Sequence, residues 1–301
     1  MTVQEALQQV SLVSANFGNA KVYRTILLDW FDFIGGKPGE VVVVDGGSDA
    51  TMQQIYWDLF NEGKIDKLQL IRPNHPDNHK DICYIQEHAV GAIASKPYLL
   101  WFKIDSLPFR KGHENWLAEA LELLERKDVF AVGGSFNMNS KHHDAWPGWY
   151  FSHKCSENFS IMKRSSFIAA MEEFAGVYIS SGFRTINPAA ATNQSRYLIE
   201  RGFEKYMERH GLFAIVKEED PTWTIFHTNL YDEQLLKARE DSLARRNLDG
   251  YMDAGNSQIK PPGVYYGTPE PTWIKKLRIR FGQSPLGPHW RRFKGLLRPQ
   301  S

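Results

Sequence analysis

The chain has 301 residues, of which 42% are hydrophobic and 24% charged, and its formal net charge is +1. This composition excludes an intrinsically disordered chain, because it supplies ample apolar material for a core. Only two cysteines are present, Cys83 and Cys155, which excludes a disulfide-stapled secreted fold. No stretch approaches the roughly 18 apolar residues of a membrane span, and the N-terminus does not read as a leader, so we expect a cytoplasmic protein.

The charge is distributed unevenly along the chain. Residues 271–301 contain eight Lys or Arg and no Asp or Glu, which leaves 28 basic and 35 acidic side chains in residues 1–270. Basic and apolar residues alternate in this tail. Such a segment suits peripheral contact with an anionic membrane, or docking on the acidic body or on another subunit. Nucleic acid is not expected as a partner, since the body is acidic and no recognition motif accompanies the tail.

The first half of the chain alternates predicted strands and helices. Strands are expected at residues 10–13, 41–44, 68–71, 97–104 and 129–132, and helices at residues 21–34, 52–60, 82–95 and 113–126. The β-branched run at residues 41–44 is typical of a central parallel strand that is buried on both faces. This rhythm predicts an α/β fold with a central, mostly parallel sheet flanked by helices.

The second half of the chain is less regular. Residues 137–157 combine polar and aromatic side chains with turn residues, and we expect them to form a loop. Further strands are expected at residues 159–162, 212–216 and 222–226, and further helices at residues 165–174 and 194–209.

Two acids follow predicted strands directly, Asp45 after the second and Asp105 after the fourth. Ligands of open α/β sheets bind beyond the carboxyl ends of the strands, near the point where the strand order reverses. The two carboxylates could therefore approach one ligand. Alternatively, residues 45–48 form a turn in which Asp45 bonds its own backbone. Spacing alone leaves both interpretations open.

These two acids belong to a pair of motifs, Val43-Val44-Asp45-Gly46-Gly47-Ser48-Asp49 and Lys103-Ile104-Asp105. In both, the sequence resembles glycosyltransferase family 2, whose members carry Val-Val-Asp-Asp-Gly-Ser-x-Asp and then Asp-x-Asp. The resemblance covers residues 10 to about 230. It implies a GT-A (Rossmann-like) catalytic domain over residues 1–235, followed by a C-terminal helix and a basic extension over residues 236–301.

The resemblance also implies a nucleotide-sugar donor, expected to be a UDP-sugar. The donor contacts that it implies are Asn16, Asp45, Gly47, Ser48, His79, Lys80, Lys103 and Asp105. Asp105 is expected to bind Mn²⁺ or Mg²⁺, which would stabilise the charge of the leaving diphosphate. His227, after a late strand, is expected as a second metal ligand. It could equally be a structural histidine at a strand end.

The motifs depart from the family pattern at Gly46 and Lys103, each of which stands where an acid is usual. One interpretation is that fewer protein ligands hold the cation. Another is that Lys103 offsets phosphate charge and reduces the need for a metal. A third is that Lys103 simply points elsewhere and is solvated.

Glu200 matches the second acid of the pair that supplies the catalytic base in the family, counted back from Gly211, while Ile199 occupies the first position. Its alternative role is a surface ion pair with Arg196. Three aromatic residues could stack on the sugar of a glycan or lipid-linked acceptor, or could pack as a lid. They are Trp146, Trp149 and Tyr150.

The expected activity is transfer of a sugar to a hydroxyl acceptor with inversion, in the assembly of a polysaccharide, another glycan or a glycolipid. A retaining transferase is the nearest alternative. The degraded motifs also suit a catalytically inactive relative that binds a nucleotide or sugar. A methyltransferase fits less well, because a complete strand and helix precede the glycine-bearing loop.

Overall fold

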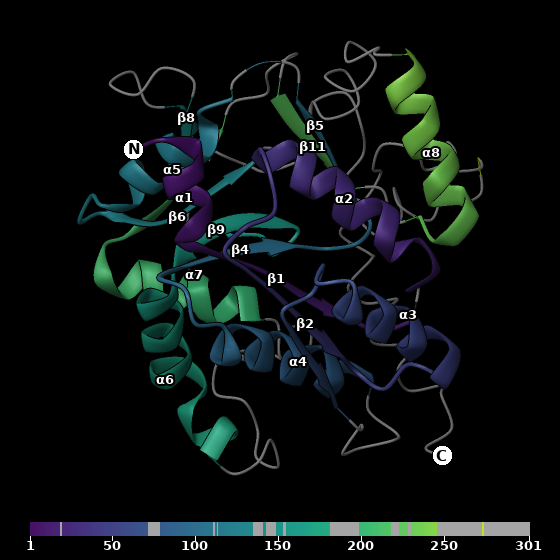
Figure 1. Ribbon diagram of the computed structural model, residues 1–301. Helices are drawn as coiled ribbons and strands as arrows, with labels where there is room; N and C mark the ends of the chain where they lie inside the picture. Colours follow the sequence, from purple (N-terminus) through teal and green to yellow (C-terminus); the bar gives the residue numbers. More distant parts are fainter. Residues whose placement is uncertain are drawn as a thin grey trace. The chain divides into compact units, whose positions relative to one another are not determined.

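A computed structural model of the chain describes residues 1–18, 20–71, 79–110, 112, 114–134, 141–142, 149–152, 155–180, 199–217, 223–227, 230–245 and 273. The chain divides into a compact unit, Met1–Tyr266, and a second unit, Gly267–Ser301. The helices and strands named below belong to the first unit (Figure 1).

The described part of the first unit contains one large sheet of nine strands. Their order is β3 (Lys67–Leu70), β2 (Glu40–Asp45), β1 (Val10–Asn16), β4 (Tyr98–Phe102), β9 (Phe159–Lys163), β6 (Val129–Gly134), β10 (Phe213–Lys217), β8 (Trp149–Ser152) and β7 (Lys141–His142). In the first seven, only β9 runs against its neighbours, since β4 and β6 both pair with it in antiparallel fashion. The predicted mostly parallel central sheet is therefore confirmed.

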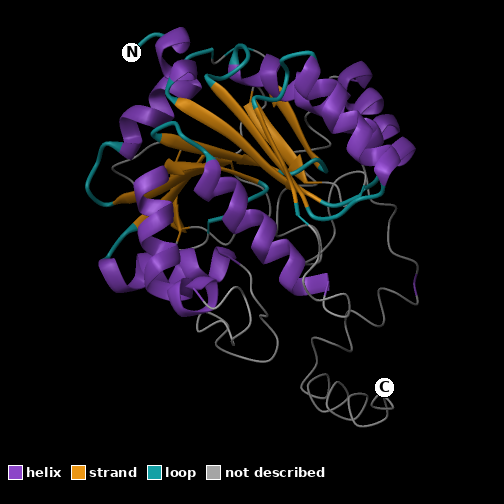
Figure 2. Ribbon diagram, turned by 60° about the horizontal axis from the view of Figure 1, so that its bottom comes forward, coloured by secondary structure: helices purple, strands orange, loops and turns teal. Residues whose placement is uncertain are grey.

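Helices cover both faces of this sheet (Figure 2). Because successive strand side chains point to opposite faces, Val41 and Val43 belong to one apolar core and Val42 and Val44 to the other. The first core is closed by α1 (Val3–Gln8), α2 (Tyr23–Ile34), α3 (Ala50–Asn61), α5 (Trp116–Leu124) and α8 (Asp232–Arg245). The second is closed by α4 (His79–Ile93), α6 (Arg164–Ser180) and α7 (Ile199–His210). The predicted α/β class is confirmed.

Local sequence signals explain where the helices of the first half begin and end. Asp49 caps α3, because its carboxylate accepts a hydrogen bond from the amide of Met52 at 2.9 Å. Helix α2 ends at Gly35, whose φ of 90° lies in the left-handed region that glycine tolerates. These signals set the residue at which α3 begins and the residue at which α2 ends.

Several elements differ from the sequence-based prediction. The expected loop at residues 137–157 contains the short strands β7 and β8, so this prediction was wrong for residues 141–142 and 149–152. Strand β8 is stabilised by pairing with β10, about 65 residues further along the chain, and no local pattern encodes such a partner. The fourth strand ends at Phe102, because the chain turns at residues 103–106 with a 3.0 Å hydrogen bond from the amide of Ser106 to the carbonyl of Lys103.

A separate two-stranded sheet was also not predicted as such. It pairs β5 (Ser106–Arg110) with β11 (Trp223–His227) in antiparallel fashion. Helix α8 runs through residue 235, where a boundary between domains is predicted. Residues 194–198 of the predicted late helix lie outside the described residues, and α7 supplies the rest of it.

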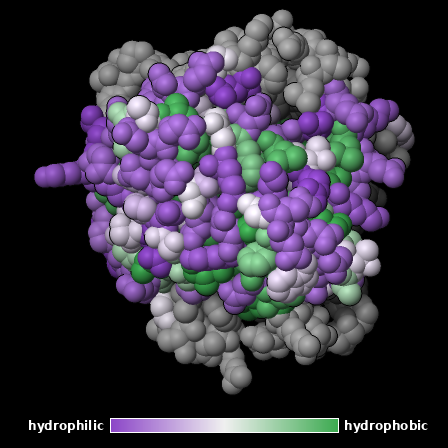
Figure 3. Space-filling model, viewed as in Figure 1, coloured by the Kyte–Doolittle hydropathy of each residue, from purple (hydrophilic) through white to green (hydrophobic). Residues whose placement is uncertain are grey.

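The surface in Figure 3 is mostly hydrophilic, with scattered hydrophobic areas. The exposed large apolar side chains of the described residues include Leu28 on α2 and Trp57 and Phe60 on α3. In the part of the chain that the structure describes, we find no helix with the length and hydrophobicity needed to span a bilayer.

Candidate functional site

The strand order reverses at β1, which has β2 on one side and β4 on the other. Both neighbours are parallel to β1, so the carboxyl ends of all three strands lie at one edge of the sheet. In open α/β sheets this switch point is where ligands bind. The residues at this edge are Asn16 at the end of β1, Asp45 at the end of β2, and Lys103 directly after β4.

The loops after β1 and β2 form one hydrogen-bonded unit. The amide of Gly46 donates to the carbonyl of Asn16 at 2.9 Å, and the Asn16 side chain donates to the carbonyl of Gly18 at 2.8 Å. The hydroxyl of Ser48 in turn accepts a 2.8 Å hydrogen bond from the amide of Gly18. Asn16 also donates to the hydroxyl of Tyr56 on α3. The structure thus brings the predicted donor residues Asn16 and Ser48 together.

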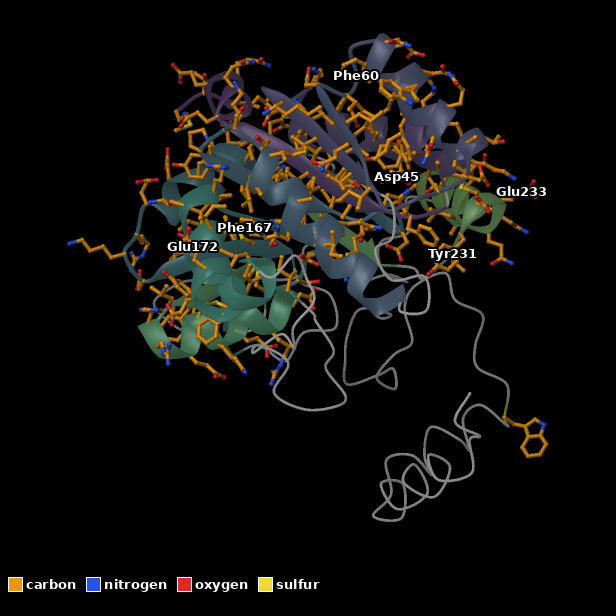
Figure 4. The ribbon with its side chains drawn as sticks, turned by 90° about the horizontal axis from the view of Figure 1, so that it is seen from below. Asp45, Phe60, Phe167, Glu172, Tyr231 and Glu233 are labelled. Atoms are coloured by element: carbon orange, nitrogen blue, oxygen red, sulfur yellow. The ribbon has the colours of Figure 1, made fainter. Side chains whose placement is uncertain are left out.

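Asp45 is fully buried at the end of β2 (Figure 4). Its Oδ2 accepts hydrogen bonds from the amide of Gly47 at 3.1 Å, the amide of Ser48 at 2.9 Å and Nε2 of Gln53 at 3.2 Å. Its Oδ1 accepts from the hydroxyl of Ser48. Gly47 adopts a φ of 99°, which an L side chain rarely allows. Turn chemistry therefore accounts for these interactions, and a contact between Asp45 and the donor stays a prediction.

Lys103 lies at the centre of a cluster of acids. Its Nζ lies 3.4 Å from Oε1 of Glu87 on α4 and 3.6 Å from Oε2 of Glu157. Glu157 comes close because β9 pairs with β4 in antiparallel register, with Phe159 opposite Phe102, so the residues before β9 lie beside those after β4. The side chains of Glu87 and Glu157 are 8% and 2% exposed, whereas that of Lys103 is 36% exposed.

The charges in this cluster shift the ionisation of two members. Burial lowers the pKa of Lys103, but the carboxylates of Glu87 and Glu157 raise it by more, with smaller contributions from Glu200 and Asp105, so the net shift is upward. Burial also raises the pKa of Glu157 well above its ordinary value. Repulsion from Glu87 adds to this effect, and the ammonium of Lys103 opposes it. Lys103 therefore stays charged, and the protonated form of Glu157 is favoured.

Glu200, the predicted base, belongs to the same cluster. It lies in the first turn of α7, where a carboxylate interacts favourably with the helix dipole. Its Oε1 accepts a hydrogen bond from the main-chain amide of Glu157 at 3.0 Å. The structure therefore brings Glu200 into the neighbourhood of Lys103 and Asp105, although almost a hundred residues separate them in sequence. Arg196, its alternative partner, lies outside the described residues.

Asp105 and His227, the predicted metal ligands, come from neighbouring segments. His227 at the end of β11 lies opposite Ser106 at the start of β5, and Ser106 directly follows Asp105. Asp105 is 9% exposed. The side chain of His227 is outside the described part of the structure. Within that part, no group of three or more His, Cys, Asp or Glu is arranged to hold a metal ion.

The remaining predicted residues are distributed as follows. His79 and Lys80 are the first residues of α4, and their side chains are not described. Trp146 lies outside the described residues. Trp149 and Tyr150 lie in β8, opposite Lys217 and Val216 of β10. Trp149 is buried in the first core, so packing accounts for its ring, and the predicted contact with a sugar stays a prediction.

Sequence reasoning missed Glu87 and Glu157. Glu87 lies within a predicted helix and Glu157 at the end of a predicted loop, and neither belongs to a motif. Only the antiparallel β4–β9 pair and the packing of α4 on β1 and β2 bring them to Lys103. A basic residue in place of an acid at position 103 was the one signal that pointed to acidic partners.

No protein-family model and no curated protein matches the sequence. Among solved structures, the chain is similar to a mannosyltransferase from Pyrobaculum calidifontis in complex with GDP-Man and Mn²⁺, at 13% identity and a TM-score of 0.44, over 84% of this chain and 66% of that chain. It is also similar to S. aureus TarS 1–349, at 12% identity and a TM-score of 0.43, over 92% of this chain and 72% of that chain.

A third similar structure is GalNAc-T7 with UDP, GalNAc and Mn²⁺, at 11% identity and a TM-score of 0.46. The alignment covers 90% of this chain and 53% of that chain, so this chain spans about half of its length. At these identities and TM-scores, the likeness concerns only the general course of the chain. The functional interpretation rests on the geometry of the site.

Proposed function

We propose that the protein is a GT-A glycosyltransferase that moves a sugar from a nucleotide-sugar donor to a hydroxyl acceptor. One observation carries this proposal: Glu200 of α7 is linked through Glu157 to Lys103 in the turn after β4, beside the switch point of the sheet. Glycosyl transfer needs a base for the acceptor hydroxyl and, close to it, a group that stabilises the charge of the leaving diphosphate. A carboxylate can do this by holding a cation. Because Lys103 replaces an acid, the alternative is a catalytically inactive protein that binds a nucleotide or sugar, and the test below distinguishes the two.

In this proposal the hydrogen-bonded loops after β1 and β2 bind the nucleoside, which we take to be uridine. Phe17, which is 51% exposed, lies in the first of these loops between Asn16 and Gly18. The rigidity of the unit, which rests on Asp45 and Ser48, would hold the base in a fixed place.

Glu200 serves as the base for an inverting transfer. Its carboxylate accepts the proton of the acceptor hydroxyl while that oxygen attacks the anomeric carbon of the donor sugar. The bond from that carbon to the diphosphate breaks, and its electron pair leaves on the diphosphate oxygen. The hydrogen bond from the Glu157 amide holds Oε1 of Glu200, and in this proposal Oε2 takes the proton.

Asp105 and His227 are the residues that would hold a divalent cation. The support is that β5 and β11 pair next to Asp105, and that a carboxylate oxygen and an imidazole nitrogen are ligands that suit Mn²⁺. When bound, such a cation stabilises the negative charge of the departing diphosphate. Two protein ligands leave room for phosphate oxygens of the donor.

We also propose that the basic tail, residues 271–301, brings the enzyme to an anionic membrane surface, where a lipid-linked acceptor would be found. The support is the sequence: eight basic residues without an acid, interleaved with apolar residues.

The function can be tested by thermal shift with a panel of UDP- and GDP-sugars, with and without MnCl₂. We expect at least one nucleotide sugar to stabilise the protein, more so with Mn²⁺, and expect Asp105→Ala to abolish the Mn²⁺-dependent part. Asp128→Ala is the control, because Asp128 is about half exposed and pairs only with Arg126 among the described residues. Equal behaviour of Asp105→Ala and wild type would refute the role of Asp105.

Two further outcomes would change the assignment. If UDP binds but no donor is hydrolysed or transferred, the protein is a binding module. If no nucleotide binds and calorimetry detects S-adenosylmethionine instead, the protein is a methyltransferase. The anomeric configuration of a product would separate inversion from retention.

A further inference from the structure

A chain of contacts connects the turn after β4 to the proposed base. It runs from Glu87 to Lys103 at 3.4 Å, from Lys103 to the Glu157 carboxyl at 3.6 Å, and from the Glu157 amide to Glu200 at 3.0 Å. These four residues come from α4, the turn after β4, the segment before β9 and the first turn of α7. Four separate elements are thus fixed at one point.

The ammonium of Lys103 pairs with two acids of the protein itself, Glu87 and Glu157. Both of its acidic partners are nearly inaccessible to water, with side chains 8% and 2% exposed. In the described residues, Oε1 of Glu157 has no hydrogen-bond partner, while Oε2 is the oxygen that faces Lys103. If Lys103 turned towards a donor phosphate, the buried carboxylate of Glu87 would lose its counter-charge and the carboxyl of Glu157 would lose its partner, which is unfavourable.

We propose that Glu87, Lys103 and Glu157 are positioning residues that fix Glu200 relative to Asp105, and that Lys103 thereby serves the base and not the phosphates of the donor. This inference rests on the proposed function for the role of Glu200. The contacts themselves can, however, be tested by hydrogen exchange, which does not depend on activity.

The physical reason is the distance sensitivity of general-base catalysis. A base must lie within hydrogen-bond reach of the acceptor hydroxyl, and a displacement of about 1 Å can cost on the order of a hundredfold in rate. Glu200 sits at a helix end, where the backbone frays most easily, and the amide of Glu157 is its described anchor. Other charged or titratable groups near this point are Asp105, Cys155 and Glu204. Burial raises the pKa of the Cys155 thiol to about 12, so it stays neutral.

The first test separates positioning from phosphate binding. In Lys103→Met, we expect the Kd of UDP with MnCl₂, measured by calorimetry, to stay within about twofold of wild type, and kcat with a donor found in the thermal-shift panel to fall by about tenfold or more. Lys103→Arg should recover part of kcat, because it restores the cation. A tenfold weaker Kd with unchanged kcat would overturn the inference, since it would identify Lys103 as a phosphate ligand.

The second test asks whether the residues act as one unit. We expect Glu87→Gln to lower kcat without changing the Kd of UDP, and the double variant Lys103→Met/Glu87→Gln to lose no more than the worse single variant. Because the double variant removes the charge of Glu87 together with that of Lys103, we expect it to be more stable than Lys103→Met. Losses that multiply in the double variant would contradict a shared role. Lys163→Met is the matched control, because Lys163 pairs with the largely exposed Glu125 at 3.1 Å, away from this cluster.

The third test needs no substrate. The bond to Glu200 should protect the amide of Glu157 from hydrogen exchange. We therefore expect Lys103→Met and Glu87→Gln to accelerate the exchange of this amide by about tenfold or more, and Lys163→Met to leave it unchanged. If the Glu157 amide exchanged equally slowly in wild type and in both site variants, the positioning role would be refuted. Faster exchange in a protein that binds no nucleotide would refute the proposed function but leave the contact chain standing.

Discussion

His227 lies opposite Ser106 in the antiparallel pair of β11 and β5, and so meets the chain next to Asp105. More than a hundred residues separate the two in sequence. This pairing is what makes a two-ligand metal site a specific hypothesis, because Asp105 alone would be a single acid in a turn.

We therefore expect His227→Ala to weaken the Mn²⁺ dependence of nucleotide binding. Loss of one of two protein ligands should raise the apparent Kd for Mn²⁺ by about tenfold or more. A ligand present at a hundred times its Kd stabilises a protein by about 2.7 kcal/mol, and a higher Kd reduces this stabilisation. The thermal shift caused by Mn²⁺ should therefore be clearly smaller in the variant. His210→Ala is the control, because His210 is exposed and pairs with Glu173. A shift that falls equally in both variants would argue against His227 as a ligand.

Asp45→Ala should destabilise the protein independently of any ligand. It removes the acceptor of the Gly47 and Ser48 amides, and the unpaired donors should cost about 2–3 kcal/mol in the free energy of unfolding measured with urea. Asp58→Ala serves for comparison, since Asp58 is exposed on α3 and accepts a bond from Gln54. A stability of Asp45→Ala within about 0.5 kcal/mol of wild type would contradict the turn interpretation.

Glu40 should make stability depend on acidic pH. Burial would raise its pKa, but hydrogen bonds from Lys67, Ser11 and Ser95 outweigh it and lower the pKa from 4.5 to about 2. Because the folded-state pKa lies below the unfolded one, the stabilisation is complete above about pH 4.5 and disappears as the pH falls towards 2.

The corresponding variant is Glu40→Gln. At pH 7 its free energy of unfolding should be lower than that of wild type by about 2 kcal/mol, and the difference should shrink at pH 3. Glu62→Gln is the control, because Glu62 forms an exposed pair with Arg24 and should matter little at either pH. A difference for Glu40→Gln that does not change between pH 7 and pH 3 would be inconsistent with this account.

Gly91→Ala should loosen the packing that holds α4, the helix of Glu87. A Cβ at Gly91 would lie 2.5 Å from ring carbons of Phe167 on α6, so the ring must move at a cost of about 1–3 kcal/mol in urea unfolding. Gly176→Ala on α6 is the matched control, since nothing lies within 4 Å of its added Cβ. That variant should be neutral or more stable by up to about 1 kcal/mol. Equal effects at both positions would disprove the steric argument.

The tail should bind anionic membranes. In the full chain, Lys275→Glu/Lys276→Glu should reduce sedimentation with phosphatidylserine vesicles by about tenfold or more, because each basic residue contributes about 1 kcal/mol. Lys21→Glu/Lys127→Glu makes the same change of charge at two exposed positions of the body and should have little effect. Equal losses in both variants, or equal binding to neutral phosphatidylcholine vesicles, would count against a membrane role of the tail.

The strands and helices of the first half could be predicted from the sequence because their signals are local. The run Val41–Val44 reports burial on both faces of a strand, and the glycines after Ile34 stop a helix whatever packs against it. The short strands β7 and β8 could not be predicted, because two to four residues carry no periodicity and their stability comes from β10.

The candidate site divides in the same way. The sequence by itself determined the strand-end acid Asp45, because a parallel strand followed by a turn puts its next polar residue at the carboxyl edge. Asp105 was expected directly after the fourth strand, but that strand ends at Phe102 and Asp105 lies in the turn before β5. Only the tertiary structure decided that Asp45 turns into its own loop and that Lys103 contacts Glu87 and Glu157. These contacts depend on the antiparallel β9 and on the packing of α4, and such long-range placement is set by the whole core.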